Sequence, residues 1–539
     1  MNLSHALIAT VLVTTGSAAT AQSSLPPVPT PAGNPTTFEK VQLGKALYWD
    51  EQLSSSRTTA CATCHIPSAG GCDPRSIGGN SLHPGLDGLL GTIDDVVGSP
   101  GVPNSDLDGS YWPVDVFGIG VQVTGRKAPS VINAAYSPML FWDGRASNTF
   151  QDPLTGATVL SDLAALESQA AGPPQSPAEM GHMGRDWSNI AARMETSKPL
   201  AMASNLDANL SAFVGNRSYP DLFETVFGTN DVTPSRILMA IAAYERTLIS
   251  DRTPFDAFVV GVPNTMTPLE LDGYGVFGGS GRCHSCHTPP LLTDNQFHNV
   301  GVSTIAQDPG RGGITGLAQD MGAFRTPGLR NVALHPPYFH DGNAATLMDV
   351  VEAYDRGGDV HENLSPMIHP LNLTAYEKTA LVAFLEVLTD PRVVNETAPF
   401  ERPTLYSESN ARPQIYGQAT PGAGGSAPIC VAIEPPLHGT DSLTIAVHGG
   451  LPDAHGFLAL SRLEDVRTFA GIELMVDIST PHALIPVRLH AVAGSASYSM
   501  VLPEDIQSIG TQFFAQWLVR DPGSPGGLSA SQGMAFTIF

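Results

Sequence analysis

The chain has 539 residues, 42% of them hydrophobic, and a formal net charge of -24 from 27 Lys and Arg against 51 Asp and Glu. This length suffices for about two to four domains with separate cores. The acidic balance argues against nucleic acid or an anionic membrane as a partner, and it suits attraction of a basic protein. An acidic surface that only keeps a secreted protein soluble is the simpler alternative.

The N-terminus has the pattern of a secretory signal peptide. An apolar run from Ala6 to Val13 is followed by small residues and by Ala19-Thr20-Ala21, an A-x-A cleavage pattern, so residues 1–21 are expected to be removed. Residues 22–36 are rich in Pro, Ser and Thr and are predicted to be a linker. No later segment approaches about 18 uninterrupted apolar residues, so no transmembrane segment is expected, and the predicted location is the periplasm or the cell exterior.

The next segment, residues 37–54, has apolar positions typical of a helix and leads into Cys61-Ala62-Thr63-Cys64-His65. This motif is typical of covalent c-type heme attachment. The two cysteines share a face of one helical turn with the histidine beside them, so both thiols can bind porphyrin vinyl groups while the imidazole reaches the iron.

The motif recurs as Cys283-His284-Ser285-Cys286-His287. A zinc site built from two Cys-x-x-Cys halves is the alternative, but it leaves the histidine after each motif unexplained. The sequence therefore predicts two covalently bound c-type hemes.

Two of the six cysteines remain, Cys72 and Cys430. In an oxidising compartment they can form a disulfide that ties the first heme loop to the C-terminal segment. Two separate thiols are the alternative.

The segment between His65 and Arg126 is rich in Gly, Asp and Pro and is predicted to be mostly loop. Its carboxylates gather on a Gly-rich stretch over residues 84–108. Calcium is one interpretation, but the spacing of an EF-hand is not met, and a solvated acidic loop is the default.

Four further helices are predicted at residues 235–249, 267–277, 347–354 and 374–388. Thr374 and Glu377 form a capping box at the start of the last helix. After about residue 400, Pro, Gly and Ser separate short apolar runs. This pattern predicts a β-sandwich over residues 405–539.

Several motifs together resemble the bacterial diheme cytochrome c peroxidases and their MauG-like relatives. They follow one another in order at residues 43–50, 61–65, 128–134, 141–145, 169–173, 177–180, 324–331 and 337–342. The resemblance implies a mainly α fold with two cytochrome c-like domains, residues 37–230 and 231–398, ahead of the β-sandwich. It implies an oxidoreductase that reduces hydrogen peroxide with electrons from a small protein such as cytochrome c, and it allows a homodimer.

The resemblance also assigns roles to individual residues. In the family a glutamate moves a proton between the two peroxide oxygens at the first heme, a role that falls to Glu179, with Gln169 in the same pocket. Trp142 corresponds to the tryptophan that relays electrons between the hemes, although a core tryptophan is the alternative. Arg145 and Arg330 are expected to bind heme propionates or to stabilise the domain interface.

The expected iron ligands follow from the same resemblance. His65 binds the first iron and His287 the second. Where these peroxidases commonly place a methionine on the second iron, this chain has Tyr354, as in MauG, and Met367 is the rival ligand. A phenolate would lower the reduction potential of the iron, whereas a thioether would raise it. His83 is a candidate for a removable ligand of the first iron, and a surface histidine is the alternative.

The family binds one calcium ion between its heme domains, through an asparagine side chain and two backbone carbonyls. Lys127 takes the asparagine position here, while His335 and Pro337 match the carbonyl positions. A charged lysine cannot coordinate calcium, so the substitution argues against the ion, and the ammonium can occupy its place.

Two other functions remain open. Tyr354 favours a MauG-like enzyme that uses peroxide-derived oxidising equivalents on a protein or organic substrate. A non-enzymatic electron-transfer or heme-sensing protein is the third reading, but a pure carrier has no use for a proton shuttle such as Glu179. The C-terminal segment resembles modules on secreted bacterial enzymes, often from planctomycetes, and an adhesion or anchoring role is a hypothesis.

Overall fold

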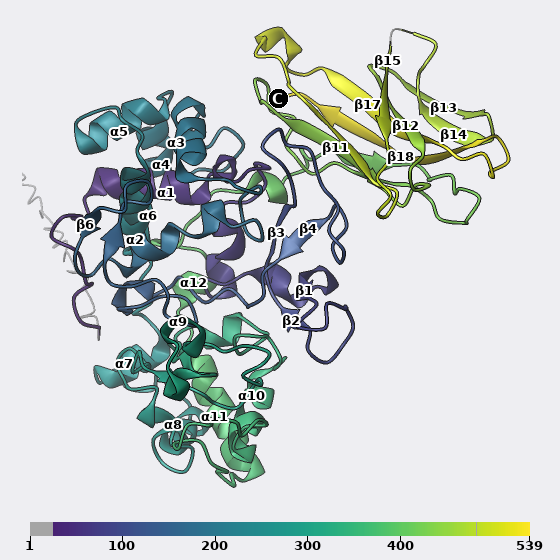
Figure 1. Ribbon diagram of the computed structural model, residues 1–539. Helices are drawn as coiled ribbons and strands as arrows, with labels where there is room; N and C mark the ends of the chain where they lie inside the picture. The colour runs from purple at the N-terminus through teal and green to yellow at the C-terminus, as the bar shows by residue number, and fades with distance from the viewer. Residues whose placement is uncertain (1–24, 481) are drawn as a thin grey trace, which may run out of the picture.

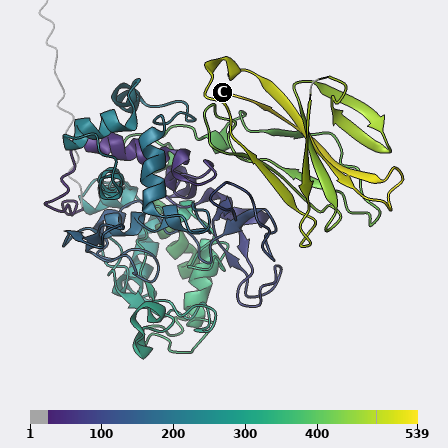
Figure 2. The same ribbon diagram turned by 45° about the horizontal axis from the view of Figure 1, so that its top comes forward.

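The computed structural model describes residues 25–480 and 482–539. The expected signal peptide and the first residues of the expected linker lie outside this range. The described residues form two helical units and a β region that stands beside the first unit, away from the second (Figures 1 and 2). Within the described ranges, no helix combines the length and apolar character needed to cross a membrane.

The first unit is built on the crossing of α1 (Phe38–Trp49) and α6 (Pro234–Glu245). The helices meet at Gly44, where a Cβ would lie 1.9 Å from the carbonyl oxygen of Ala240. Only glycine permits so close an approach of two backbones. The other helices of this unit are α2 (Ala165–Ala170), α3 (Trp187–Thr196), α4 (Ala208–Val214) and α5 (Tyr219–Phe227).

The second unit repeats this arrangement. Helix α8 (Pro268–Gly278) crosses α11 (Ala375–Val387) at Gly273, where a Cβ would lie 1.9 Å from the carbonyl oxygen of Ala380. In both units the helix that contains the glycine precedes a 3₁₀ turn with the heme-attachment cysteines, Cys61–Cys64 or Cys283–Ser285. The unit also contains α7 (Pro254–Val259), α9 (Gly312–Thr315) and α10 (Leu347–Arg356), and α12 (Pro391–Val394) follows it.

The four helices expected after residue 230 are confirmed as α6, α8, α10 and α11, with ends that differ by up to a few residues. The capping box of Thr374 and Glu377 at α11 is also confirmed. Residues 25–36 contain no helix or strand, but Asn34 is fully buried and donates to Glu167 at 2.7 Å. This part of the expected linker therefore packs on the first unit.

The boundary between the helical units differs from the expected residue 230. Helix α6 supplies Ile237, Leu238 and Ile241 to the core of the first unit, whereas the core of the second unit begins at Phe255. Amphipathic periodicity located α6, but periodicity does not reveal which helix covers an apolar face.

The segment between His65 and Arg126 is largely irregular, as expected, with short 3₁₀ turns and two hairpins. One pairs β1 (Leu82–His83) with β2 (Val96–Val97), and the other pairs β3 (Pro100–Pro103) with β4 (Val121–Val123). The second of these, with its long connection, is called the 100–123 hairpin below. Two more short pairs join β5 (Phe150–Gln151) to β6 (Thr158–Leu160) and β7 (Phe297–His298) to β8 (Phe324–Arg325).

The β region consists of antiparallel sheets, in agreement with the expected all-β segment. One sheet has the order β10-β11-β16 and the other β15-β12-β17-β18-β9, while β13 pairs with β14. Ile445 of the smaller sheet shares a core with Trp517 and Met534 of the larger one, so the two sheets pack face to face. The strands are β9 (Gln414–Tyr416), β10 (Ile429–Val431), β11 (Leu443–His448), β12 (His455–Ser461), β13 (Glu464–Phe469), β14 (Ile472–Val476), β15 (His482–Arg488), β16 (Ala496–Met500), β17 (Gln512–Arg520) and β18 (Leu528–Thr537).

The helix crossing yields a stability prediction. Gly273→Ala should lower the free energy of unfolding by about 2–3 kcal/mol, because its methyl group fits only if α8 and α11 move apart. Gly275→Ala on the same helix is the matched control, since no atom lies within 4 Å of a Cβ at that position. It should raise the free energy of unfolding by about 0.5–1 kcal/mol through helix propensity. Denaturant unfolding followed by circular dichroism measures both, and equal destabilisation by the two variants would contradict the packing argument.

Candidate functional site

The first attachment motif presents a histidine whose ring is already oriented. The Nδ1 atom of His65 lies 3.0 Å from the carbonyl oxygen of Gly71. This hydrogen bond leaves Nε2 as the nitrogen that can bind an iron. Burial lowers the pKa of His65, which favours the neutral imidazole that a metal requires.

The second motif has the same histidine geometry but a different exposure. Nδ1 of His287 lies 3.0 Å from the carbonyl oxygen of Leu292. Ala62 and Thr63, between the first pair of cysteines, are buried, whereas His284 and Ser285 are exposed. The first attachment turn is therefore enclosed by protein, and the second lies at the surface.

A cavity of about 500 Å³ adjoins the second motif and extends to the boundary of the two units. Cys283, Cys286 and His287 line it, as do both candidates for the distal iron ligand, Tyr354 and Met367. Burial, followed by the nearby Cys283 and Cys286, raises the pKa of Tyr354. Met367 is 43% exposed. The tyrosine is thus the more enclosed of the two candidates.

Arg325, on β8, gives this cavity a buried positive charge. The residue is 8% exposed and donates to Ser137 Oγ at 2.9 Å, and its Nε has no hydrogen-bond partner within the described residues. Burial lowers its pKa to about 10. A buried guanidinium with an unused donor suits a carboxylate such as a heme propionate. Together with the thiols, the histidine and the cavity, Arg325 fits a c-type heme.

Sequence reasoning did not single out Arg325. It lies inside the motif at residues 324–331, but nothing in the local pattern indicates that the side chain is buried in the structure.

Trp142 lies where the two units meet. Its indole Nε1–H donates to the carbonyl oxygen of Lys127 at 2.8 Å, and the backbone N–H of Arg325 donates to the carbonyl oxygen of Trp142 at 2.8 Å. The ring lies edge-on to His340, with 6.3 Å between centroids, and it lines the cavity. Trp142 is therefore bonded to both units.

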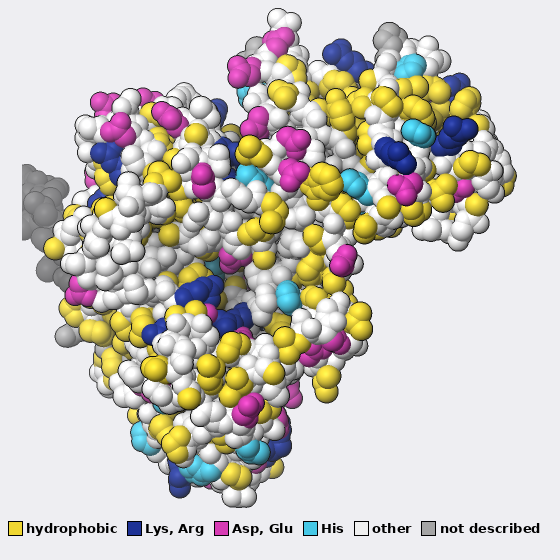
Figure 3. Space-filling model, in the orientation of Figure 1, with side chains coloured by type: hydrophobic (Ala, Val, Ile, Leu, Met, Phe, Trp, Pro, Cys, Tyr) yellow, Lys and Arg dark blue, Asp and Glu magenta, His cyan; other side chains and the backbone are white. Residues whose placement is uncertain are grey.

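Charged side chains join the units around this tryptophan. Arg126 of the first unit donates at 2.6 Å to Asp308 of the second unit and to Asp143, the residue after Trp142. Arg311 of the second unit donates to the backbone carbonyl of Asp143 at 2.9 Å. Figure 3 shows basic side chains set in a hollow between the helical units.

The two arginines expected near the propionates or the interface already have carboxylate partners. Arg145 pairs with Asp143 at 2.9 Å, and its guanidinium lies 3.6 Å from the ring centre of Phe141. Arg330 forms two bonds of 2.7 and 2.8 Å to Asp256 inside the second unit. Arg330 also lines the cavity, and its Nε has no hydrogen-bond partner within the described residues.

Glu179 lies beside the first attachment turn. Burial raises the pKa of its carboxyl, against the lowering effects of a hydrogen bond from Ser176 and of the nearby Arg145. After burial, the charge of Glu179 is among the causes that raise the pKa of Cys61 and Cys64. Glu179 is therefore half-buried, and its carboxyl is near enough to both thiols to influence their pKa values.

Gln169 and His83 lie on two different elements of the first unit. Gln169 is a half-buried residue of α2, ten residues before Glu179. His83 lies on β1 with its ring 6.4 Å from that of Phe117, and burial lowers its pKa. The backbone N–H of Gly85 donates to His83 Nδ1 at 3.3 Å, so the ring is held by its own loop and by Phe117.

Cys72 and Cys430 are free thiols, so the disulfide alternative is wrong and the separate-thiol alternative is confirmed. Cys430 lies in the core of the β region. Cys72 lines the interdomain cavity, where the side chain of Lys127 bonds to it. The lysine is itself 4% exposed, and it cannot coordinate a cation, so the residues here do not fit calcium.

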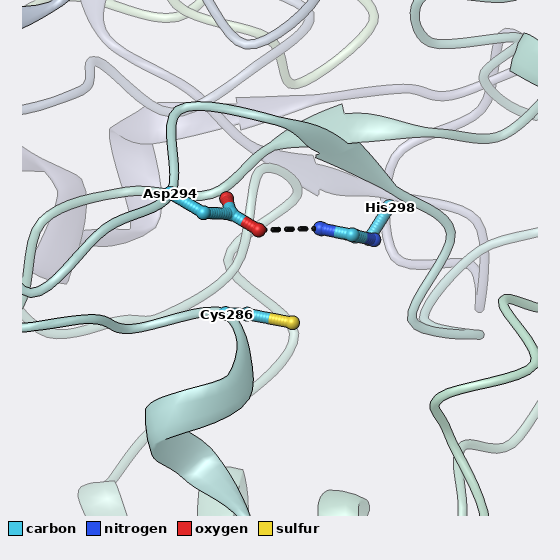
Figure 4. A group of neighbouring side chains, drawn as sticks. All are labelled: Cys286, Asp294 and His298. Atoms are coloured by element: carbon cyan, nitrogen blue, oxygen red, sulfur yellow. Dashed lines mark hydrogen bonds and ion pairs between the residues drawn. The ribbon is translucent and has the colours of Figure 1, made fainter.

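Within the described ranges, three side chains lie close enough to hold a metal ion: Cys286, Asp294 and His298 (Figure 4). Nε2 of His298 lies 2.9 Å from Asp294. Because Cys286 belongs to the second attachment motif, a thioether would use its sulfur, and the group is part of the heme site. The acidic stretch at residues 84–108 forms no such group among the described residues.

Comparison with known proteins identifies the family. Residues 38–264 match the family model of di-haem cytochrome c peroxidase. The chain is 31% identical over 404 residues to the cytochrome-c peroxidase IdrP1 of Denitromonas iodatirespirans, which covers 68% of this chain and 87% of the relative. It is 30% identical over 367 residues to the methylamine utilization protein MauG of Methylorubrum extorquens, with 67% and 81% covered.

A third relative is the cytochrome c551 peroxidase of Nitrosomonas europaea, 30% identical over 390 residues, with 72% of this chain and 89% of the relative covered. Membership of this family implies c-type hemes, which agrees with the two attachment motifs and the cavity. The chain belongs to the diheme cytochrome c peroxidase and MauG-like family, and it is an oxidoreductase that acts on peroxide.

Proposed function

We propose that this protein reduces hydrogen peroxide at the heme attached to Cys61 and Cys64. Electrons enter from a small redox protein at the heme attached to Cys283 and Cys286. The observation that carries this assignment is the asymmetry of the two motifs. The first turn is enclosed and has the half-buried Glu179 beside it, while the second turn is exposed.

When bound, the hemes supply electron storage and the iron at which the O–O bond breaks. The protein must then move protons, since one peroxide takes up two electrons and two protons to give two waters. Glu179 is suited to take the proton from one peroxide oxygen and to return it to the other. Burial raises its pKa toward the working pH, which favours both transfers. Gln169 would orient the peroxide through its amide.

The electron path follows the contacts of the interface. Exposure of His284 and Ser285 makes the second heme site accessible to a protein donor. Trp142 is bonded to both units and lines the cavity of the second site, so its ring is placed to relay electrons toward the first. The net charge of -24 would attract a basic donor. We place this reaction in the periplasm or outside the cell.

The role of Glu179 is testable in the holoprotein with ferrocytochrome c and peroxide. Glu179→Gln should lower kcat by about 10²–10⁴-fold, because an amide cannot exchange the proton. Wild-type activity should fall as the pH drops through the raised pKa of Glu179, since only the carboxylate accepts a proton. Glu195→Gln, at an exposed position of α3, is the control and should behave as wild type. Normal turnover by Glu179→Gln would refute the assignment.

A second candidate function is peroxide-dependent oxidation of a protein or organic substrate, as a MauG-like enzyme would perform. Tyr354 is the observation that favours it, because this phenol lines the cavity close to Cys283 and Cys286 and is more enclosed than Met367. A phenolate ligand would hold the second heme at a low potential. Such a heme is a poorer acceptor for electrons from a carrier protein.

The ligand of the second heme can be identified by spectroscopy. Tyr354→Phe should alter the low-spin EPR signal of this heme and raise its reduction potential, because the anionic ligand is lost. Met367→Leu is the matched control and should leave both unchanged. The opposite pattern would assign the ligand to Met367 and remove the argument for the second function.

A further inference from the structure

The β region is connected to the peroxide site through the 100–123 hairpin. In Figures 1 and 2, this hairpin lies between the first unit and the β region. The hairpin contacts the β region on one side and the turn that carries Glu179 on the other. A second connection between the β region and this turn runs through Arg57 and Arg193.

On one side, the hairpin is bound to the β region by buried polar contacts. The phenol of Tyr111 donates to Glu434 Oε1 at 2.9 Å, and both residues are buried. The hydroxyl of Thr444 donates to the carbonyl oxygen of Gly109 at 2.8 Å. The same contact buries an apolar cluster of Tyr111, Ile119 and Ala446. The hairpin thus packs the side chains of Tyr111 and Ile119 against the β region.

On the other side, the hairpin touches the turn that carries Glu179. A Cβ at Gly101 would lie 2.2 Å from the carbonyl oxygen of Ala178 and 2.6 Å from that of Glu179. The backbone N–H of Met183 donates to the carbonyl oxygen of Ser105 at 3.0 Å. The two backbones are therefore in direct contact, so a shift of the hairpin would displace the turn that carries Glu179.

The second connection between the β region and the Glu179 turn begins at Asp441. Asp441 of the β region pairs with Arg57, and it lies 3.8 Å from Arg193 on α3. Arg193 donates to the carbonyl oxygen of Ser55 at 2.9 Å. The N–H of Ser55 in turn donates to the carbonyl oxygen of Met180 at 2.8 Å. This chain of bonds ends at the residue after Glu179.

We propose that the C-terminal β region positions the peroxide site, because it holds the 100–123 hairpin and the Arg193 contacts that fix the Glu179 turn. The inference rests on the proposed role of Glu179. Tyr111 and Asp441 are positioning residues, since they act on Glu179 through the backbone and touch no reacting atom. An ordered turn keeps the carboxyl in one place and limits its hydration, and a small displacement of a proton-transfer group is costly to the rate.

Two variants of the full-length holoprotein test this role. Tyr111→Phe leaves the buried Glu434 without its phenol donor, and it should lower kcat about tenfold. Asp441→Asn keeps the shape but removes the charge that faces Arg57 and Arg193, and it should lower kcat about threefold. Asp453→Asn, an exposed position of the β region 3.9 Å from Arg488, is the control and should behave as wild type.

The pH profile separates positioning from a merely structural role. If the Glu179 turn loosens, water reaches the carboxyl, and the acid limb of the kcat profile should move to lower pH in both variants. The charged groups near Glu179 are Arg145 and Arg185, which donates to the carbonyl oxygen of Met180 at 3.2 Å, and both variants keep them. Cys61 and Cys64 are thioethers in the holoprotein and do not titrate. A loss of folded protein would lower activity without moving the limb. Should Tyr111→Phe fail to fold, Asp441→Asn carries the test, because its carboxylate side chain is 69% exposed.

Glu179→Gln measured in parallel separates the two proposals. If it abolishes turnover while Tyr111→Phe and Asp441→Asn keep the wild-type kcat and pH limb, the positioning role is overturned and the proposed function stands. If Glu179→Gln turns over normally, both are overturned. The expected result is a lower kcat in all three variants, with a shifted acid limb in the two positioning variants.

Discussion

Close backbone contact between two helices is the constraint on which each heme-binding turn depends. Gly44 lets α1 approach Ala240, and Gly273 lets α8 approach Ala380, in both cases with no room for a side chain. Each crossing fixes the helix that leads into an attachment turn, and the next loop supplies the carbonyl that orients the histidine. The two units thus share one packing arrangement. Ion pairs around Trp142 hold the units together.

The two units are assigned different functions because the surroundings of their attachment turns differ. The first turn is enclosed and has a half-buried carboxyl beside it, which suits proton transfer. The second turn is exposed, and a phenol and a thioether line its cavity, which suits electron entry and storage. The β region stands beside the first unit and away from the second in Figures 1 and 2, which suits a role in the first site rather than in electron entry.

Local patterns predicted the parts of this structure that depend on short stretches of chain. The attachment motifs, the capping box at Thr374, the helices after residue 230 and the all-β segment all follow from residues near one another in sequence. The domain boundary and the disulfide alternative failed because they depend on which distant surfaces pack together. The burial of Arg325 and the bond between Tyr111 and Glu434 went unnoticed for the same reason.

The central claim is that only the heme at Cys61–Cys64 offers an open iron face. Titration of the half-reduced holoprotein with cyanide, followed by EPR and optical spectroscopy, tests this most directly. The account predicts that one cyanide binds per chain and changes the EPR signal of the ferric heme at Cys61–Cys64, while the optical bands of the other, ferrous heme stay unchanged. Binding of two cyanides per chain, or of none, would contradict it.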